Sequence, residues 1–134
     1  GLRTDYVGAY YGMYFTEVTE YYTRENNDEK EMLKLLYQSL RALESKAIPN
    51  RLVKCVFECK TLGVNGEFPG VPRDKKLEQS TVYALQYIAA SPVEKLYTFT
   101  VTETVLEQLE EVSAEYMKKY VGHHFKSLEI LQVL

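Results

Sequence analysis

The sequence predicts an all-α protein, a helical bundle of about five helices. Apolar residues recur every three or four positions through most of the chain, which is the spacing of amphipathic helices. Short connections with capping residues, glycine or proline separate these periodic segments. One irregular loop is predicted at residues 63–79, and residues 97–101 alternate in a way typical of a short extended segment.

The first helix is predicted over residues 5–22, where one face carries Val7, Tyr10, Tyr11, Tyr14, Val18, Tyr21 and Tyr22. Polar residues 24–28 interrupt this pattern. Asp28 is predicted to cap the second helix, with Glu31 completing a capping box. This helix extends to about residue 45, and its predicted apolar stripe is Met32, Leu33, Leu36, Leu40 and Leu43.

A third helix follows Pro49, because proline disfavours the helical conformation of the preceding Ile48. Its apolar face is predicted to contain Leu52, Cys55, Val56, Cys59 and Leu62. Gly63 is the predicted stop of this helix. A fourth helix is predicted over residues 80–90.

Residues 91–94 contain a capping serine, a proline at the first helical position and a glutamate at the third, so they predict a short helix. The last long helix is capped by Thr100 or Thr102 and extends to about residue 121, where Gly122 ends it. Its predicted buried stripe is Val105, Leu109, Val112, Tyr116 and Tyr120.

Length and composition indicate one domain, residues 1–134, that is large enough to bury a core. The net charge of −3 argues against this chain being the main electrostatic platform for nucleic acid. No apolar run approaches the roughly 20 residues of a membrane helix, and the N-terminus lacks the order of a signal peptide. With only two cysteines, a secreted disulfide scaffold is not indicated, so we expect a cytoplasmic protein without membrane contact.

Cys55 and Cys59 lie one turn apart in the middle and last turn of the third helix. A redox pair needs C-x-x-C at a helix N-terminus, where the dipole stabilises a thiolate. A structural zinc site needs four ligands, and the only histidines are the adjacent His123 and His124. We therefore predict core cysteines, with no metal and no cofactor.

Catalytic motifs are scarce, because the chain has no phosphate-binding glycine loop, no G-x-S-x-G and no H-E-x-x-H. The carboxylates of the last long helix are interpreted as a solvated face: Glu107, Glu110, Glu111 and Glu115. Six of the 12 tyrosines precede residue 23, and they indicate core and interface surface or a ligand cavity. We therefore predict no enzyme, and a ligand-binding or regulatory domain with a tyrosine-lined cavity remains the alternative.

Four stretches resemble, in order, the C-terminal part of RecO, the bacterial recombination mediator family: AYYGMYFTEVTEYY, LLYQSLRAL, FECKTLGVNGEFP and YVGHHFKSLEIL. The resemblance covers essentially the whole chain and rests on order and spacing. The residues that match family motifs are Tyr14, Glu17, Phe57, Glu58, Leu62, Gly66, Tyr120, Gly122, Lys126 and Ser127. The chain departs from many members in lacking their zinc-binding cysteines after the third helix, where it reads GVPRDKKLEQS.

The resemblance implies a non-enzymatic role in DNA repair and recombination after DNA damage. RecO-like proteins help to load a recombinase onto single-stranded DNA coated with single-strand-binding protein. The family's N-terminal OB-type barrel is absent, so we expect this chain to be an excised C-terminal domain. Partners would be single-strand-binding protein and other recombination mediators, with DNA bound through the missing domain and weakly, if at all, through this fragment.

The helical domain of this family is associated with binding the acidic, hydrophobic tail of single-strand-binding protein. Such a tail needs an apolar pocket with cations at its rim. On the third helix, Arg51, Lys54 and Lys60 accompany an apolar face and are the predicted contacts.

Overall fold

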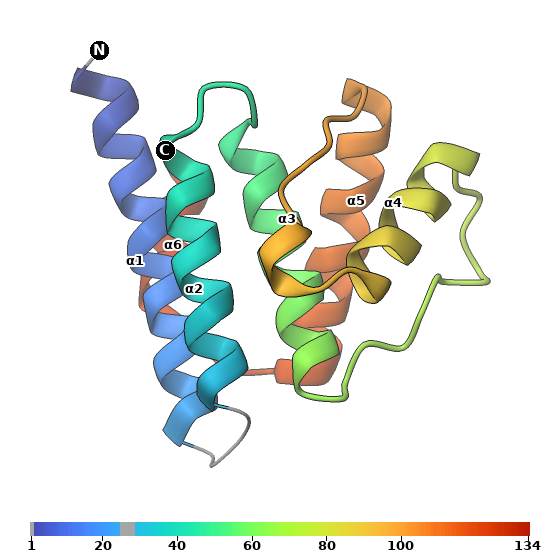
Figure 1. Cartoon of the computed structure of the whole chain (residues 1–134), viewed down its shortest axis with the longest axis horizontal. Helices are drawn as coiled ribbons and strands as arrows, with labels where there is room; N and C mark the ends of the chain where they lie inside the picture. Colours follow the sequence, from blue (N-terminus) through green and yellow to red (C-terminus); the bar gives the residue numbers. More distant parts are fainter. Residues whose placement is uncertain (1, 25–28) are drawn as a thin grey trace.

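Helices make up every regular element of the computed structural model, which describes residues 2–24 and 29–134. They are α1 (Leu2–Arg24), α2 (Glu29–Glu44), α3 (Asn50–Val64), α4 (Gln79–Ala90), the 3-10 turn η1 (Val93–Lys95), α5 (Glu103–Tyr116), the π-helical turn η2 (Met117–Val121) and α6 (Lys126–Gln132). The predicted all-α bundle is confirmed. Figure 1 shows α1, α2, α3 and α5 running side by side, with α4 inclined against them.

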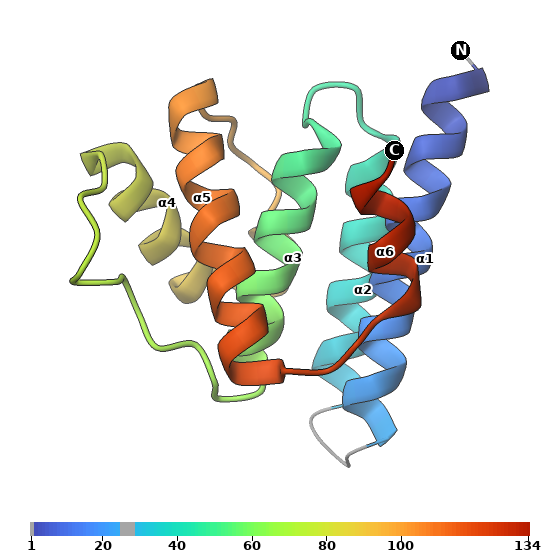
Figure 2. The same cartoon turned by 180° about the vertical axis from the view of Figure 1, so that it is seen from behind.

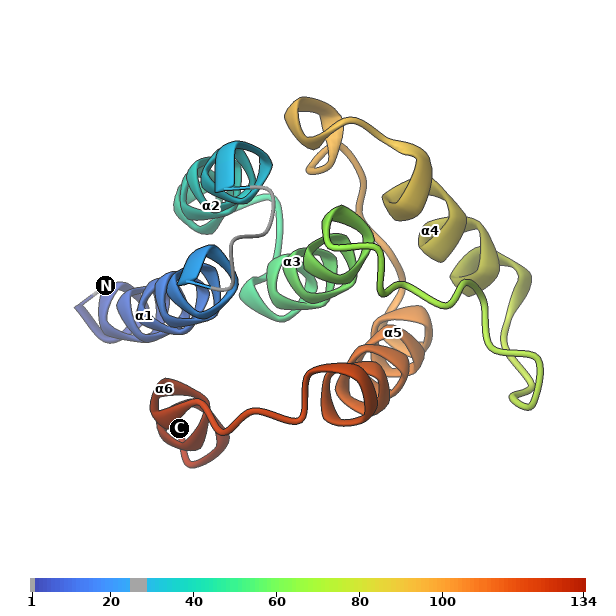
Figure 3. The ribbon, with the colours of Figure 1, turned by 90° about the horizontal axis from the view of Figure 1, so that it is seen from below.

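The third helix, α3, lies at the centre of the bundle, as Figure 3 shows from below. It contacts α1, α2, α4 and α5. The predicted apolar face was too narrow, because Val53, Phe57, Glu58 and Thr61 are buried as well. A helix surrounded on most sides buries nearly all its side chains, so no single stripe describes it.

The predicted stripe of α2 was correct for Met32 and in part for Leu36 and Leu43, which pack against the core, but wrong for Leu33 and Leu40. The buried residues are Met32, Leu35, Ser39 and Ala42, whereas Leu33 is 49% exposed and Leu40 is 37% exposed. The polar Ser39 is tolerated in the core because its hydroxyl is hydrogen-bonded to the Tyr97 hydroxyl at 2.5 Å. That partner comes from a distant segment, so the leucine spacing within α2 did not indicate it. The predicted cap Asp28 lies outside the described residues.

The end of α3 also differs from the prediction, because Gly63 lies within the helix. The chain turns at Gly66, whose φ of +70° is a left-handed conformation that glycine adopts without strain. Residues 65–78 then form the irregular loop. Farther on, Pro92 precedes η1 as its cap and no side chain caps that turn, so the predicted capping by Ser91 was wrong.

The start and end of the last long helical segment agree with the sequence. Thr102 caps α5 by accepting a hydrogen bond from the N–H of Val105 at 3.3 Å. The segment widens into η2 and ends at Gly122, whose φ is +62°. The extended residues 97–101 form no strand within the described ranges, and α6 was not predicted because seven residues hold too little periodicity.

None of the described helices is both long enough and apolar enough to cross a membrane.

Candidate functional site

Part of the set that matches the RecO-like motifs lies at the junction of α1, α3 and the chain leading into α6, namely Tyr14, Glu17, Phe57, Glu58, Lys126 and Ser127. The Tyr14 hydroxyl donates a hydrogen bond to Glu58 Oε2 at 2.6 Å. Phe57 stacks on Phe15, with ring centroids 4.4 Å apart. Phe125, just before α6, packs edge-on against Tyr14 at 5.9 Å. The motif therefore joins three segments that are far apart in the sequence.

An ion pair between the buried Glu58 and the partly exposed Lys54 lies within this junction. Glu58 is 1% exposed, and Lys54 Nζ lies 3.0 Å from its Oε2 and 5.4 Å from the centre of the Tyr14 ring. Burial alone would lower the pKa of Lys54, but the adjacent Glu58 carboxylate raises it overall. Burial and Glu58 both raise the pKa of Tyr14, which keeps that hydroxyl protonated as a donor.

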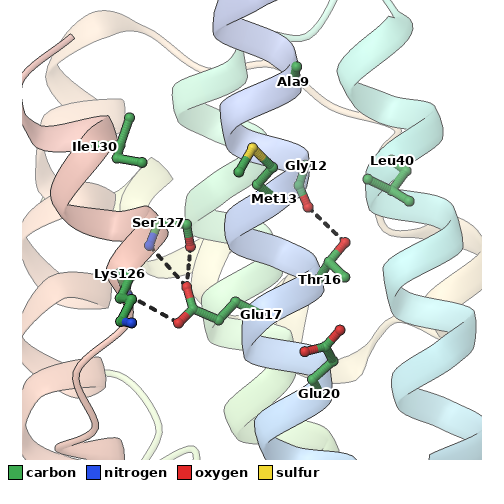
Figure 4. A pocket seen from close by; sticks show the side chains of 10 residues that line it. All are labelled: Ala9, Gly12, Met13, Thr16, Glu17, Glu20, Leu40, Lys126, Ser127 and Ile130. Carbon is green, nitrogen blue, oxygen red and sulfur yellow. Dashed lines mark hydrogen bonds between the residues drawn. The ribbon is translucent and has the colours of Figure 1, made fainter.

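Glu17 holds the start of α6 against α1 (Figure 4). Its carboxylate accepts hydrogen bonds from the backbone N–H of Lys126 at 3.1 Å, from that of Ser127 at 3.0 Å and from the Ser127 hydroxyl. The first N–H groups of a helix have no partner within it, and no local side chain caps α6. Glu17 therefore caps a helix about 110 positions away and lines a surface groove of about 610 Å³ between α1 and α6.

Replacing Glu17 with alanine is expected to lower the free energy of unfolding at pH 7 by about 2 kcal/mol, because hydrogen bonds to a charged acceptor are lost. Partial burial alone would raise the pKa of Glu17, but the bonds from Ser127 and Lys126 lower it overall. A lowered folded-state pKa stabilises the fold above the unfolded pKa of about 4.3, and this contribution disappears as pH falls through the folded value.

Urea unfolding of wild type and Glu17→Ala at pH 7 and near pH 3 measures this contribution. The difference between the two proteins should shrink in acid. Ser127→Ala is the matched control, because it removes only the side-chain donor and should cost about 1 kcal/mol. An equal difference at both pH values would contradict an ionised cap.

The three predicted cations point toward different elements. Arg51 reaches α5, where Nη2 lies 2.5 Å from Glu110 and Nη1 lies 2.8 Å from Glu103. Lys54 is paired with Glu58, as described above. Lys60 donates to the backbone carbonyls at the end of α4, including that of Ser91 at 2.6 Å. They therefore link helices and do not form one rim.

A surface groove beside Lys60 combines an apolar lining with a further cation. It measures about 630 Å³ between the 65–78 loop and α4, and is lined by Phe68, Pro69, Gly70, Val71, Pro72, Arg73, Leu85, Gln86 and Ala89. Lys60 Nζ also lies 3.2 Å from the Ala89 carbonyl oxygen. Arg73 is exposed and makes no ion pair within the described part of the chain. The sequence analysis missed Arg73 because loop residues have no periodicity to place them.

The tyrosines near the N-terminus divide into two groups. Tyr14 and Tyr22 are buried, and the Tyr22 hydroxyl donates to Glu67 at 2.8 Å. Others line an open cleft of about 640 Å³ at the beginning of α1 and the end of the chain, formed by Tyr6, Val7, Tyr10, Tyr11, Leu131, Val133 and Leu134. The buried tyrosines are therefore part of the core, as one interpretation predicted, and the others line an open cleft.

Comparison with known proteins shows which family this chain belongs to. The family model described as "Recombination protein O C terminal" matches residues 3–73 and 67–129. The chain belongs to this RecO family. It is also similar to the DNA repair protein RecO of Acetivibrio thermocellus, with 34% identity over 59 residues.

The stretch shared with that RecO protein is 44% of this chain and 24% of the relative, so the chain matches about a quarter of the relative's length. No solved structure matches the chain significantly. The resemblance read from the motifs is confirmed at the level of the family.

The zinc site of many RecO proteins does not fit the residues present. Cys55 and Cys59 are each 2% exposed and unpaired. Burial raises the pKa of Cys55 to about 12 and also raises that of Cys59, so both thiols resist the deprotonation that zinc binding requires. Within residues 2–24 and 29–134, no three His, Cys, Asp or Glu side chains are grouped as metal ligands.

Proposed function

We propose that this chain is the helical C-terminal domain of a longer, cytoplasmic and non-enzymatic mediator of DNA repair and recombination. The family match, which extends from residue 3 to residue 129, carries this proposal. The name of the Acetivibrio relative adds support for a repair role. The motif junction supports it further, because the family residues hold α1, α3 and α6 together in this chain.

We further propose that the domain binds the acidic tail of single-strand-binding protein and so helps recombinase loading. The groove between the 65–78 loop and α4 offers apolar surface from the half-buried Phe68 and Val71, and Arg73 is among its lining residues. A guanidinium binds a carboxylate with two parallel hydrogen bonds, which suits an acidic tail. Lys60 lies beside the same groove, whereas Arg51 and Lys54 would contact a tail only on the opposite side of α3.

Calorimetry with a short acidic peptide that ends in an aromatic residue tests this function. Wild type is expected to bind with roughly micromolar affinity, and Arg73→Ala about tenfold more weakly, a change of about 1.4 kcal/mol. Arg51→Ala is the matched control, because it removes the same charge on the other side of α3 and should bind like wild type. The affinity of wild type should also fall as salt rises.

The outcomes separate the possible surfaces. If only Arg51→Ala loses affinity for the peptide, the tail binds on the α3–α5 side. If wild type shows no heat of binding at millimolar peptide, the proposed binding of the tail is wrong. Charge reversal at Lys54 is a poor test, because it places a second carboxylate beside the buried Glu58.

A ligand-binding role is the second candidate, and the open cleft lined by Tyr6, Tyr10 and Tyr11 supports it. Its volume of about 640 Å³ lies within the usual range of small-molecule sites. This role would gain weight if small aromatic compounds raised the melting temperature of wild type but not of Tyr10→Ala.

A further inference from the structure

A cationic segment joins α5 to α6 on an otherwise acidic protein. Residues 117–126 read MKKYVGHHFK, with three lysines, two histidines and no carboxylate, whereas the whole chain has a net charge of −3. We call residues 117–126 the basic turn. Figure 2 shows it running along the lower edge of the bundle from α5 to α6. It was not recognised as a basic stripe because it spans a helix end, a turn and a helix start.

The lysines of the basic turn are exposed, and the carboxylates nearest in sequence are engaged elsewhere. Glu115 lies 3.0 Å from Lys75, and Glu129 lies 3.4 Å from His124. Glu17 is occupied by the N–H groups at the start of α6. Within the described residues, the three side chains therefore have no acidic partner: Lys118, Lys119 and Lys126. Three exposed cations are thus available to an external anion.

The basic turn also contains aromatic rings, one of them beside a lysine. The exposed His123 ring stacks on Tyr21 with centroids 4.4 Å apart and an interplanar angle of 30°. Phe125 supports it from the edge at 4.9 Å. Lys119 Nζ lies 5.3 Å from the centre of the Tyr120 ring. A flat ring held in place in the same ten-residue segment as exposed lysines provides the two groups that bind single strands, a stacking surface for bases and cations for phosphates.

We propose that the basic turn is a contact site for single-stranded DNA, with the lysines at phosphates and a base stacked on His123. This proposal rests on the proposed function in one respect, which is the choice of DNA as the polyanion that binds. The DNA contact is confined to this segment, because the three lysines attract phosphates while the protein as a whole, with a net charge of −3, repels them. Binding at physiological salt is therefore weaker than micromolar. A plot of the logarithm of the binding constant against the logarithm of the salt concentration should have a slope of about −2. This value corresponds to roughly −0.7 for each of three phosphates neutralised on a single strand.

Fluorescence anisotropy with a labelled 20-nucleotide oligo(dT) at 50 and 200 mM NaCl tests the site. The triple variant Lys118→Ala, Lys119→Ala, Lys126→Ala is expected to lose at least tenfold in affinity and most of the salt slope. A matched triple variant, Lys46→Ala, Lys76→Ala, Lys95→Ala, removes three exposed lysines that form no ion pair within the described ranges, and should stay within twofold of wild type.

His123→Ala separates stacking from charge. It is expected to weaken oligo(dT) binding about fivefold, since a stacked base contributes at least that much. Binding of inorganic polyphosphate, which has no bases, should not change. If His123→Ala leaves both ligands unaffected, the basic turn binds polyanions in general and the assignment to DNA is wrong. Equal losses in the two triple variants, or no oligo(dT) binding by wild type at 50 mM NaCl, would also overturn it.

The acidic tail peptide distinguishes this inference from the function on which it rests. The basic-turn triple variant should bind that peptide as wild type does. Failure of the peptide to bind wild type, with oligo(dT) binding intact, would remove the proposed partner and leave the DNA contact in place.

Discussion

Replacing Lys54 with methionine is expected to lower the free energy of unfolding by about 3 kcal/mol, because removing one partner of a buried ion pair leaves the other charge uncompensated. Glu58 is 1% exposed, and among the described residues its Oε2 is hydrogen-bonded by Lys54 Nζ and the Tyr14 hydroxyl alone. Its Oε1 is buried without a hydrogen-bond partner in the described part of the chain. The carboxylate therefore depends on Lys54. Urea unfolding followed by circular dichroism measures the loss.

A second substitution tests whether the uncompensated charge is the cause. Adding Glu58→Gln to Lys54→Met keeps the volume similar and removes the remaining charge, so no buried charge is left without a partner. The double variant should therefore be more stable than Lys54→Met alone. If it is less stable, the Glu58 carboxylate stabilises the fold even without Lys54, through the hydrogen bond from Tyr14, and an uncompensated charge is not the cause of the loss.

Replacing Phe57 with alanine is expected to lower the free energy of unfolding by about 4 kcal/mol, within the range for large-to-small changes in a core. Phe57 is fully buried on the central helix and stacks on Phe15 at an interplanar angle of 24°. The cavity would open between α1 and α3, where little can move to fill it. Thermal unfolding should show a decrease in melting temperature of about 15 °C, from roughly 4 °C per kcal/mol for a domain of this size.

Phe57→Leu is the control for this prediction, because it keeps an apolar side chain and should cost about 1.5 kcal/mol or less. Equal losses for alanine and leucine would mean that ring stacking, and not filled volume, carries the stabilisation.

The family motif in this chain is therefore mainly architectural. Tyr14, Phe57 and Glu58 are buried in the junction, and Glu17 caps α6 through Ser127. The first three offer no free surface to a partner, and the carboxylate of Glu17, at the surface groove between α1 and α6, is already hydrogen-bonded. The proposed contacts lie elsewhere, at Arg73 and at the basic turn, in segments that the motif does not cover or covers only in part.

Much of the fold could be predicted from local signals. The helical class and the end at Gly122 were predicted correctly, and the cap is Thr102, one of the two threonines predicted, because periodicity and capping depend on residues a few positions apart. The same local logic misplaced the stop at Gly63 and the stripe of α2. The error in α2 concerns residues whose environment is set by other helices, whereas Gly63 is exposed and α3 continues for only one residue beyond it.

The sequence by itself determined the family, the helical class and the presence of cations on α3. Only the tertiary structure decided what those cations do, because each binds a partner that periodicity does not indicate. Arg51 pairs with α5, Lys54 pairs with Glu58 within α3, and Lys60 donates to the end of α4. Periodicity records which side of a helix a residue occupies, but not which helix faces it. The availability of a charge depends on that neighbour, so the free lysines of the basic turn could be recognised only once the chain was folded.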